Sequence, residues 1–187
     1  MLKKAKDSVV TAKGHVAKRA PSSRTHKKSP ARDMAQLRGS GHKIRVYLDN
    51  CCYNRPFDDQ SQVKVHLETE AKLIIQSLMR TGIVEYVWSF ILRLESGQNP
   101  DDQIRFAISS WPSGSVVDVP PLDEIRERAH DFEAKGVKPS DALHLACAEF
   151  AKCDWFFTVD KGILKKIRNI GFMRVANPVE FILEGQA

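Results

Sequence analysis

The sequence lacks the glycine-rich and nucleophile motifs of several large enzyme classes. No GxGxxG follows its first apolar run, and no GxxxxGK[ST] occurs in its 187 residues. Dinucleotide binding and P-loop phosphate binding are therefore excluded. The nucleophile elbow GxSxG is also missing, which excludes the usual serine-hydrolase site of α/β-hydrolases. Any chemistry must come from other side chains.

Cysteine and long apolar runs are scarce as well. The four cysteines contain no CxxC pair and no Cys/His spacing that suits structural zinc. We expect reduced thiols in a cytoplasmic protein. No apolar run approaches the roughly 18 residues that a membrane helix needs. We therefore expect a soluble protein with no membrane partner.

Acidic residues are scarce at the N-terminus, where the first forty positions hold 11 Lys and Arg but only Asp7 and Asp33 as acids. The net charge of +6 therefore comes from this segment, and the rest of the chain is mildly acidic. We expect residues 1–42 to be a basic, disordered extension of a domain over residues 43–187. Three interpretations of the extension stay open: a nucleic-acid-binding arm, an organellar transit peptide, or a start codon assigned too early, with Met34 as the true start.

From residue 44 onward, short apolar runs alternate with segments of helical periodicity. The expected strands are Ile44–Asp49, Ile83–Trp88, Val116–Val119, Trp155–Val159 and Met173–Val175. The expected helices are Ser61–Arg80, Ser89–Glu95, Asp101–Ser110, Pro121–Lys135, Ser140–Ala151, Lys161–Asn169 and Pro178–Leu183. We expect a loop over residues 50–62, where a proline and two aspartates oppose regular structure. This alternation predicts an α/β fold, a parallel sheet with helices on both faces in three α/β/α layers.

Four acids stand where such a sheet would bring them together. Asp49 and Asp160 each end a strand-like run, and Asp141 opens a helix. Glu95 lies one helical stretch after the run Val84–Trp88. Each acid alone also fits a turn, a helix cap or a solvated surface. The coincidence of all four at strand ends and helix starts predicts one pocket. Because clustered carboxylates repel one another, that pocket predicts a bound cation.

Other polar residues near the four acids are expected to surround the site rather than to bind the cation directly. Ser140 and Thr158 flank two of the acids and would orient a carboxylate or a metal-bound water. Asp141 and His144 form an Asp-x-x-His pair that suits a transition metal, but packing or a hydrogen bond near the site explains His144 better. We expect the loop acids Asp58 and Asp59 to be solvated. An acid-only site suits Mg²⁺ or Mn²⁺, which activate water for phosphodiester hydrolysis or clamp a phosphate.

At these residues the chain resembles the PIN-domain family, and in particular the VapC-like toxin ribonucleases of type II toxin–antitoxin pairs. The matching segments are Val46–Phe57, Ser89–Glu95, Ser140–Ala146, Phe157–Asp160 and Asn177–Phe181. They cover nearly all of the expected domain, and their order and spacing are more specific than any one of them. Asn50 departs from the pattern, because Ser or Thr is common after the first acid.

The resemblance implies that Asp49, Glu95, Asp141 and Asp160 are the catalytic, metal-binding acids, with Asn50, Ser140 and Thr158 around them. It also implies Mg²⁺ or Mn²⁺, an RNA substrate, a cognate antitoxin and a homodimer. The resulting hypothesis is a metal-dependent endoribonuclease. Two alternatives stay open: a non-catalytic RNA-binding PIN module, and a Mg-dependent phosphotransfer domain with Asp49 as nucleophile. The phosphotransfer alternative is weakened because Cys51 stands where phosphatases of that type carry a second Asp.

Overall fold

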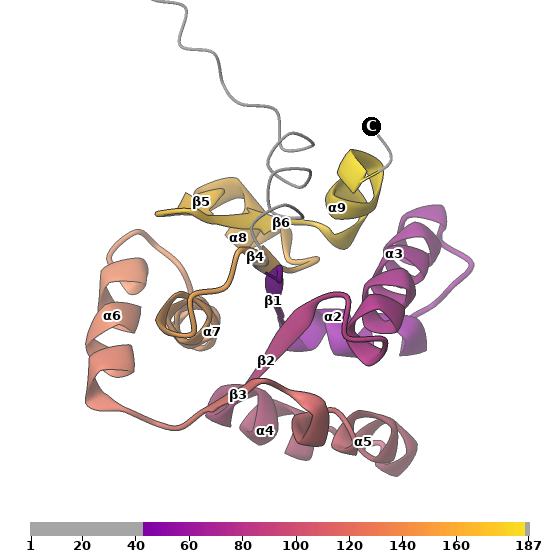
Figure 1. Ribbon diagram of the computed structural model, residues 1–187, viewed down its shortest axis with the longest axis horizontal. Helices are drawn as coiled ribbons and strands as arrows, with labels where there is room; N and C mark the ends of the chain where they lie inside the picture. Colours follow the sequence, from indigo (N-terminus) through magenta and orange to yellow (C-terminus); the bar gives the residue numbers. More distant parts are fainter. Residues whose placement is uncertain (1–42, 186–187) are drawn as a thin grey trace, which may run out of the picture.

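The apolar runs of the sequence form one six-stranded sheet in a computed structural model that describes residues 43–185 (Figure 1). The expected extension over residues 1–42 lies outside the described residues. The strands are β1 (Arg45–Leu48), β2 (Glu85–Ser89), β3 (Val117–Val119), β4 (Trp155–Phe157), β5 (Asn169–Ile170) and β6 (Met173–Ala176). β1 and β4 are apolar on both faces, since Val46, Tyr47 and Leu48, as well as Phe156 and Phe157, are completely buried. Burial on both faces is typical of a parallel strand that is covered by helices.

Helices cover both faces of the sheet, which confirms the predicted α/β fold. Figure 1 shows α6 and α7 on one side of the strands and α3 and α9 on the other. The helices are α2 (Asn50–Asn54), α3 (Val63–Arg80), α4 (Phe90–Gly97), α5 (Asp102–Ser109), α6 (Asp123–Glu133), α7 (Pro139–Phe150), α8 (Lys161–Lys166) and α9 (Pro178–Gly185). Two single 3-10 turns are η1 (Arg55–Phe57) and η2 (Pro112–Gly114). Among the described helices, none has the length and apolar character needed to cross a membrane.

The strand order places a topological switch point at the centre of the sheet. The order is β3-β2-β1-β4-β6-β5, with every pair parallel except β5 and β6. From β1 the chain proceeds outward through β2 and β3, and it then returns to β4 on the other side of β1. The connection after β1 therefore runs to one side of the sheet, and the connection after β4 runs to the other side. Because these two connections diverge, a crevice opens at the carboxyl ends of β1 and β4.

The predicted loop over residues 50–62 is wrong in its first half. α2 starts directly after Asp49, and η1 follows it. Cys52 and Tyr53 are buried in the core, so tertiary packing stabilises a helix too short to form alone. Pro56 lies within the first two positions of η1, where a missing N–H costs nothing. The proline is therefore compatible with a helical turn there.

The predicted helix over residues 161–169 is also partly wrong. α8 ends at Lys166, and Ile167 is already extended. The strand β5 follows and pairs antiparallel with β6. Ile167 and Ile170 are both buried, and this burial in the core overrides the helical propensity of the lysine-rich segment.

Candidate active site

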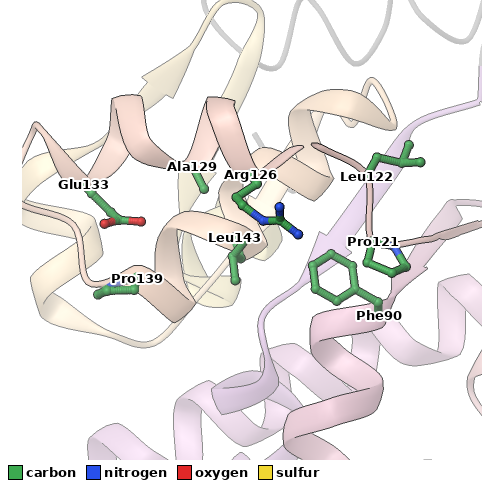
Figure 2. A pocket seen from close by; sticks show the side chains of 8 residues that line it. All are labelled: Phe90, Pro121, Leu122, Arg126, Ala129, Glu133, Pro139 and Leu143. Atoms are coloured by element: carbon green, nitrogen blue, oxygen red, sulfur yellow. The ribbon is translucent and has the colours of Figure 1, made fainter. Parts of the chain in front are cut away.

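The four acids predicted from the sequence line one open cavity of about 350 Å³ at the switch point. Its lining consists of Asp49, Asn50, Cys51, Asn54, Arg55, Asp58, Glu95, Asp141, Val159 and Asp160. A second cavity, of about 170 Å³, lies between α4, α6 and α7 (Figure 2). Its lining is mostly apolar and contains Glu133 as its one acid. The first cavity therefore has the chemistry of a candidate site.

Asp49 is the most enclosed of the acids, with an exposed fraction of 5%. It follows β1 and occupies the N-cap position of α2, but its side chain makes no capping hydrogen bond. Oδ2 instead accepts hydrogen bonds from Thr158 Oγ1 at 2.8 Å and Cys51 Sγ at 3.0 Å. These two donors hold one oxygen of Asp49 at the base of the cavity.

Glu95 and His144 lie directly beside Asp49. His144 Nε2 is 3.0 Å from Glu95 Oε2 and 3.7 Å from Asp49 Oδ1. One ligand atom from each of the three residues falls within 4.8 Å of the others, which is compact enough to hold a metal ion. The structure thus places a histidine in the innermost group, where the sequence favoured packing or a hydrogen bond for this residue.

The far side of the imidazole is held by a buried chain of hydroxyls. His144 Nδ1 is 2.8 Å from Tyr47 Oη, which is 2.6 Å from Ser89 Oγ. Burial disfavours the protonated ring, but the hydrogen bond to Glu95 and the charges of Asp49, Glu95 and Asp141 outweigh burial and raise the pKa of His144. The hydroxyl chain fixes the ring orientation, as is usual for a histidine that ligates a metal.

Asp141 is the acid of the cluster whose pKa is raised by burial and by the neighbouring carboxylates. It lies in the first turn of α7, yet Lys138 is the N-cap, so Asp141 is not the cap. Burial, followed by repulsion from Asp49 and Asp160, raises the pKa of Asp141 to about 6, although Lys138 and His144 oppose the rise. A carboxyl whose pKa is raised by burial and by like charges is a marker of a functional pocket.

Asp160 is both a helix cap and a wall of the cavity. Its Oδ1 accepts hydrogen bonds from the backbone N–H groups of Gly162 and Ile163 in the first turn of α8. A Cβ at Gly162 would lie 2.8 Å from that oxygen, so any other residue there would require the Asp160 side chain to shift. The structural role foreseen for Asp160 as a cap is confirmed, and the same residue lines the cavity.

The three residues expected around the acids differ in their contacts. Thr158 Oγ1 donates to Asp49 and accepts from the backbone N–H of Asp160, so it links β1 to the end of β4. Asn50 lines the cavity, and its buried Oδ1 accepts no hydrogen bond from the described residues. Ser140 is half-buried and does not line the cavity. Thr158 and Asn50 therefore have direct structural links to the site.

Sequence reasoning did not single out Tyr47, Cys51 or Arg55 as site residues. Tyr47 sits in a buried strand, where an aromatic residue is usually core. A hydrogen bond with Cys52, then burial and the charge of Asp49, hold the pKa of the Cys51 thiol well above its usual range, so it is a donor rather than a nucleophile. Arg55 lines the cavity beside the acids. Its position after an acid-bearing strand in a short motif was the one available signal.

The donor set fits a divalent cation. Asp49, Glu95 and His144 would provide the close ligands, and Asp141 and Asp160 lie on the walls of the same cavity. The buried, unpartnered Oδ1 of Asn50 is a further oxygen without an internal donor. Carboxylates suit Mg²⁺ and Mn²⁺, and an imidazole favours the transition metal of the two.

Comparison with known proteins gives the family. No curated protein matches the chain. The family model described as PIN domain matches residues 46–169, which is about two thirds of the chain and includes all four acids. Proteins with this domain are generally nucleases. On this match, together with the parallel sheet and its acidic cavity, the chain belongs to the PIN-domain family.

Proposed function

We propose that this protein is a metal-dependent endoribonuclease that hydrolyses RNA phosphodiester bonds. The observation that supports this most strongly is the convergence of Asp49, Glu95, Asp141 and Asp160 on one cavity at the switch point, with His144 against two of them. An acidic, open cavity repels a phosphodiester unless a cation is present, so the proposal requires Mg²⁺ or Mn²⁺.

In this proposal Asp49, Glu95 and His144 hold the metal, and Asp141 and Asp160 complete the site directly or through water. The metal would lower the pKa of a bound water and polarise the phosphate. Thr158 and Cys51 orient Asp49. Tyr47 keeps the His144 ring turned so that Nε2 faces the carboxylates. In the metal-free protein the pKa of Asp141 is about 6, and a bound cation would favour its ionised form.

The resemblance to VapC-like ribonucleases supports a more specific role. We propose that the protein acts in the cytoplasm as the toxin of a type II toxin–antitoxin pair, as a homodimer with a cognate antitoxin. In the described residues, Leu67, Ile74 and Phe106 are among several large apolar side chains that are substantially exposed. Exposed apolar side chains of this kind are compatible with protein partners.

The test is cleavage of single-stranded RNA by the purified protein with Mg²⁺, Mn²⁺ or EDTA. We expect cleavage only with a divalent metal, and we expect Asp49→Asn to abolish it while the circular dichroism spectrum stays unchanged. Asp59→Asn is the matched control, because Asp59 is exposed and does not line the cavity. Its side chain accepts a hydrogen bond from the backbone N–H of Ser61 within the same turn. Cleavage at the wild-type rate by Asp49→Asn would contradict the proposal.

The same experiment separates the alternatives. RNA binding without cleavage in any metal would favour a non-catalytic RNA-binding module. Phosphorylation of the protein by a small phosphodonor, lost in Asp49→Asn, would favour phosphotransfer with Asp49 as nucleophile. The contacts of Asp49 argue against that chemistry, because one of its oxygens already accepts two hydrogen bonds and the side chain is 5% exposed.

A further inference from the structure

Among the residues that the structure describes, Arg55 is the one basic residue in the lining of the acidic cavity. It follows the last residue of α2 and opens η1. Its backbone carbonyl accepts hydrogen bonds from Asp58 N, Gln60 Nε2 and Thr69 Oγ1 at 3.0–3.2 Å. The main chain of Arg55 is therefore fixed in place, and its side chain extends from a rigid base.

The guanidinium is positioned by two carboxylates of very different exposure. Arg55 Nη2 forms an ion pair at 3.1 Å with Glu68 Oε2, whose side chain is 2% exposed. Glu68 is held in turn by Lys64 Nζ and Asn177 Nδ2, both at 2.6 Å. On the other side, Arg55 Nη1 donates a hydrogen bond at 2.7 Å to Asp58, whose side chain is 46% exposed.

Only part of the hydrogen-bonding capacity of the Arg55 guanidinium is used within the described residues. A guanidinium carries five N–H donors in a planar fork. The bond to Asp58 is its only hydrogen bond within the described residues, because Glu68 Oε2 lies at ion-pair distance without hydrogen-bond geometry and the buried Nε has no partner. Glu68 thus anchors a planar guanidinium whose terminal nitrogens keep N–H groups available for two oxygens of a phosphate.

We propose that Arg55 binds a backbone phosphate of the RNA strand, and that Asp58 occupies Arg55 until RNA arrives. This inference rests on the proposed ribonuclease function and names a positioning residue for it. The phosphate replaces the exposed Asp58 carboxylate, whereas the buried Glu68 keeps the guanidinium in place. The Arg55 side chain is 16% exposed, but its partner Asp58 is 46% exposed, so the pair can open on the side of Asp58. A phosphate that accepts two hydrogen bonds from the guanidinium can then replace the carboxylate.

The contacts of Arg55 separate it from the residues assigned to the metal. Its guanidinium contacts Asp58 and Glu68, whereas the candidate ligands are Asp49, Glu95 and His144. We therefore assign to Arg55 a phosphate beside the scissile one, so that it positions the strand and takes no part in bond cleavage.

The experiment measures binding of a fluorescein-labelled single-stranded RNA by anisotropy, with Mg²⁺, in an Asp49→Asn background that does not cleave. Arg55→Gln should weaken binding about tenfold, because it removes a charge-assisted hydrogen bond. It should also reduce the slope of log K against log salt by about 0.7, the value for one phosphate contact with a single strand. Asp58→Asn should change affinity in the opposite direction and tighten binding by about 2- to 5-fold.

Three further variants separate phosphate binding from a purely structural role. Arg93→Gln also removes one positive charge, but it lies outside the cavity and pairs with the exposed Asp118, so it should leave the slope unchanged. Arg55→Lys keeps the charge without the fork and should lose part of the affinity. Arg55→Gln removes one of the two cations that pair with the buried Glu68, and Lys64 remains. Arg55→Gln combined with Glu68→Gln is therefore measured as well, with a thermal melt of each protein.

The outcomes distinguish this inference from the proposed function. If the wild type cleaves no RNA and the parent protein binds none, both fall. If it binds RNA but Arg55→Gln and Arg93→Gln have the same effect on the slope, or Asp58→Asn does not tighten binding, only the role of Arg55 is overturned. If both Gln variants at position 55 unfold, the Asp58→Asn result alone decides, since that change leaves Arg55 and Glu68 in place.

Discussion

Replacing Asp141 by Asn should stabilise the metal-free protein at neutral pH. The pKa of Asp141 is raised from about 3.9 to about 6, mainly by burial and then by Asp49 and Asp160. Two pKa units correspond to roughly 3 kcal/mol, and screening at this half-buried position reduces that to about 1–1.5 kcal/mol. Loss of a carboxylate from the first turn of α7 costs about 0.5 kcal/mol in the opposite direction. The net gain is about 0.5–1 kcal/mol, or roughly 1–4 °C in Tm.

The pH dependence of this gain has a definite sign. Because the pKa of this acid is higher in the folded state than in the unfolded state, folding takes up protons between about pH 4 and pH 6. Stability from this group is therefore greatest below about pH 4, and it is lost as pH rises to about 6. The variant should match the wild type near pH 4 and exceed it in stability at pH 7.5.

A divalent metal should reverse the order of the two proteins. At a metal concentration of 100 times Kd, binding stabilises the folded state by about 2.7 kcal/mol. The wild type should gain several degrees in Tm from titrated Mn²⁺, and Asp141→Asn should gain much less because its site has lost a carboxylate. The variant should thus melt higher in EDTA and lower in saturating Mn²⁺.

Differential scanning fluorimetry at pH 4, 6 and 7.5, in EDTA and with titrated Mn²⁺, measures all of these differences. Asp59→Asn is the control, since it removes an acid outside the cavity and should follow the wild type throughout. An Asp141→Asn protein that melts lower than the wild type in EDTA, and that responds equally to Mn²⁺, would refute the clustered-carboxylate reasoning.

Three other predictions test the surroundings of the site. Thr158→Val should weaken Mn²⁺ binding about 10- to 100-fold by calorimetry, because it removes a buried hydrogen bond that orients Asp49. His144→Asn should reduce the Mn²⁺ shift in Tm more than the Mg²⁺ shift if the imidazole is a ligand, and equal losses would assign it to hydrogen bonding alone. Removing residues 1–40 should leave metal-dependent cleavage of a short RNA unchanged within about twofold, with a shallower salt dependence on long RNA; a truncated protein that does not fold would disprove the domain boundary.

The sequence predicts the central strands well because parallel, fully covered strands are apolar at nearly every position. β1 and β4 are of this kind, and Asp49 and Asp160 stand out as the first charges after them. The segments that were predicted wrongly are short. α2 and β5 have five and two residues, and tertiary packing rather than local propensity decides their conformation.

The role of His144 illustrates what sequence spacing does not contain. The i, i+3 spacing to Asp141 places the two residues on one side of α7. The shortest carboxylate contact of His144 is instead to Glu95, 49 residues away, and its other nitrogen faces Tyr47, 97 residues away. These contacts follow from how α4 and β1 pack around α7, so no local pattern reveals them. Arg55 is a similar case, since its anchor Glu68 lies on a different helix.

Asp49 and Asp160 show why a capping position does not decide between structure and function. Both follow a central strand and precede a helix, which is the sequence context of an N-cap. Asp160 caps α8 with Oδ1, whereas Asp49 makes no cap and turns toward Thr158 and Cys51. A carboxylate has two oxygens, so a cap that holds Oδ1 of Asp160 also fixes the direction of Oδ2. Capping is therefore compatible with a place in the cavity, and it lowers the entropy that a metal would otherwise have to remove from that side chain.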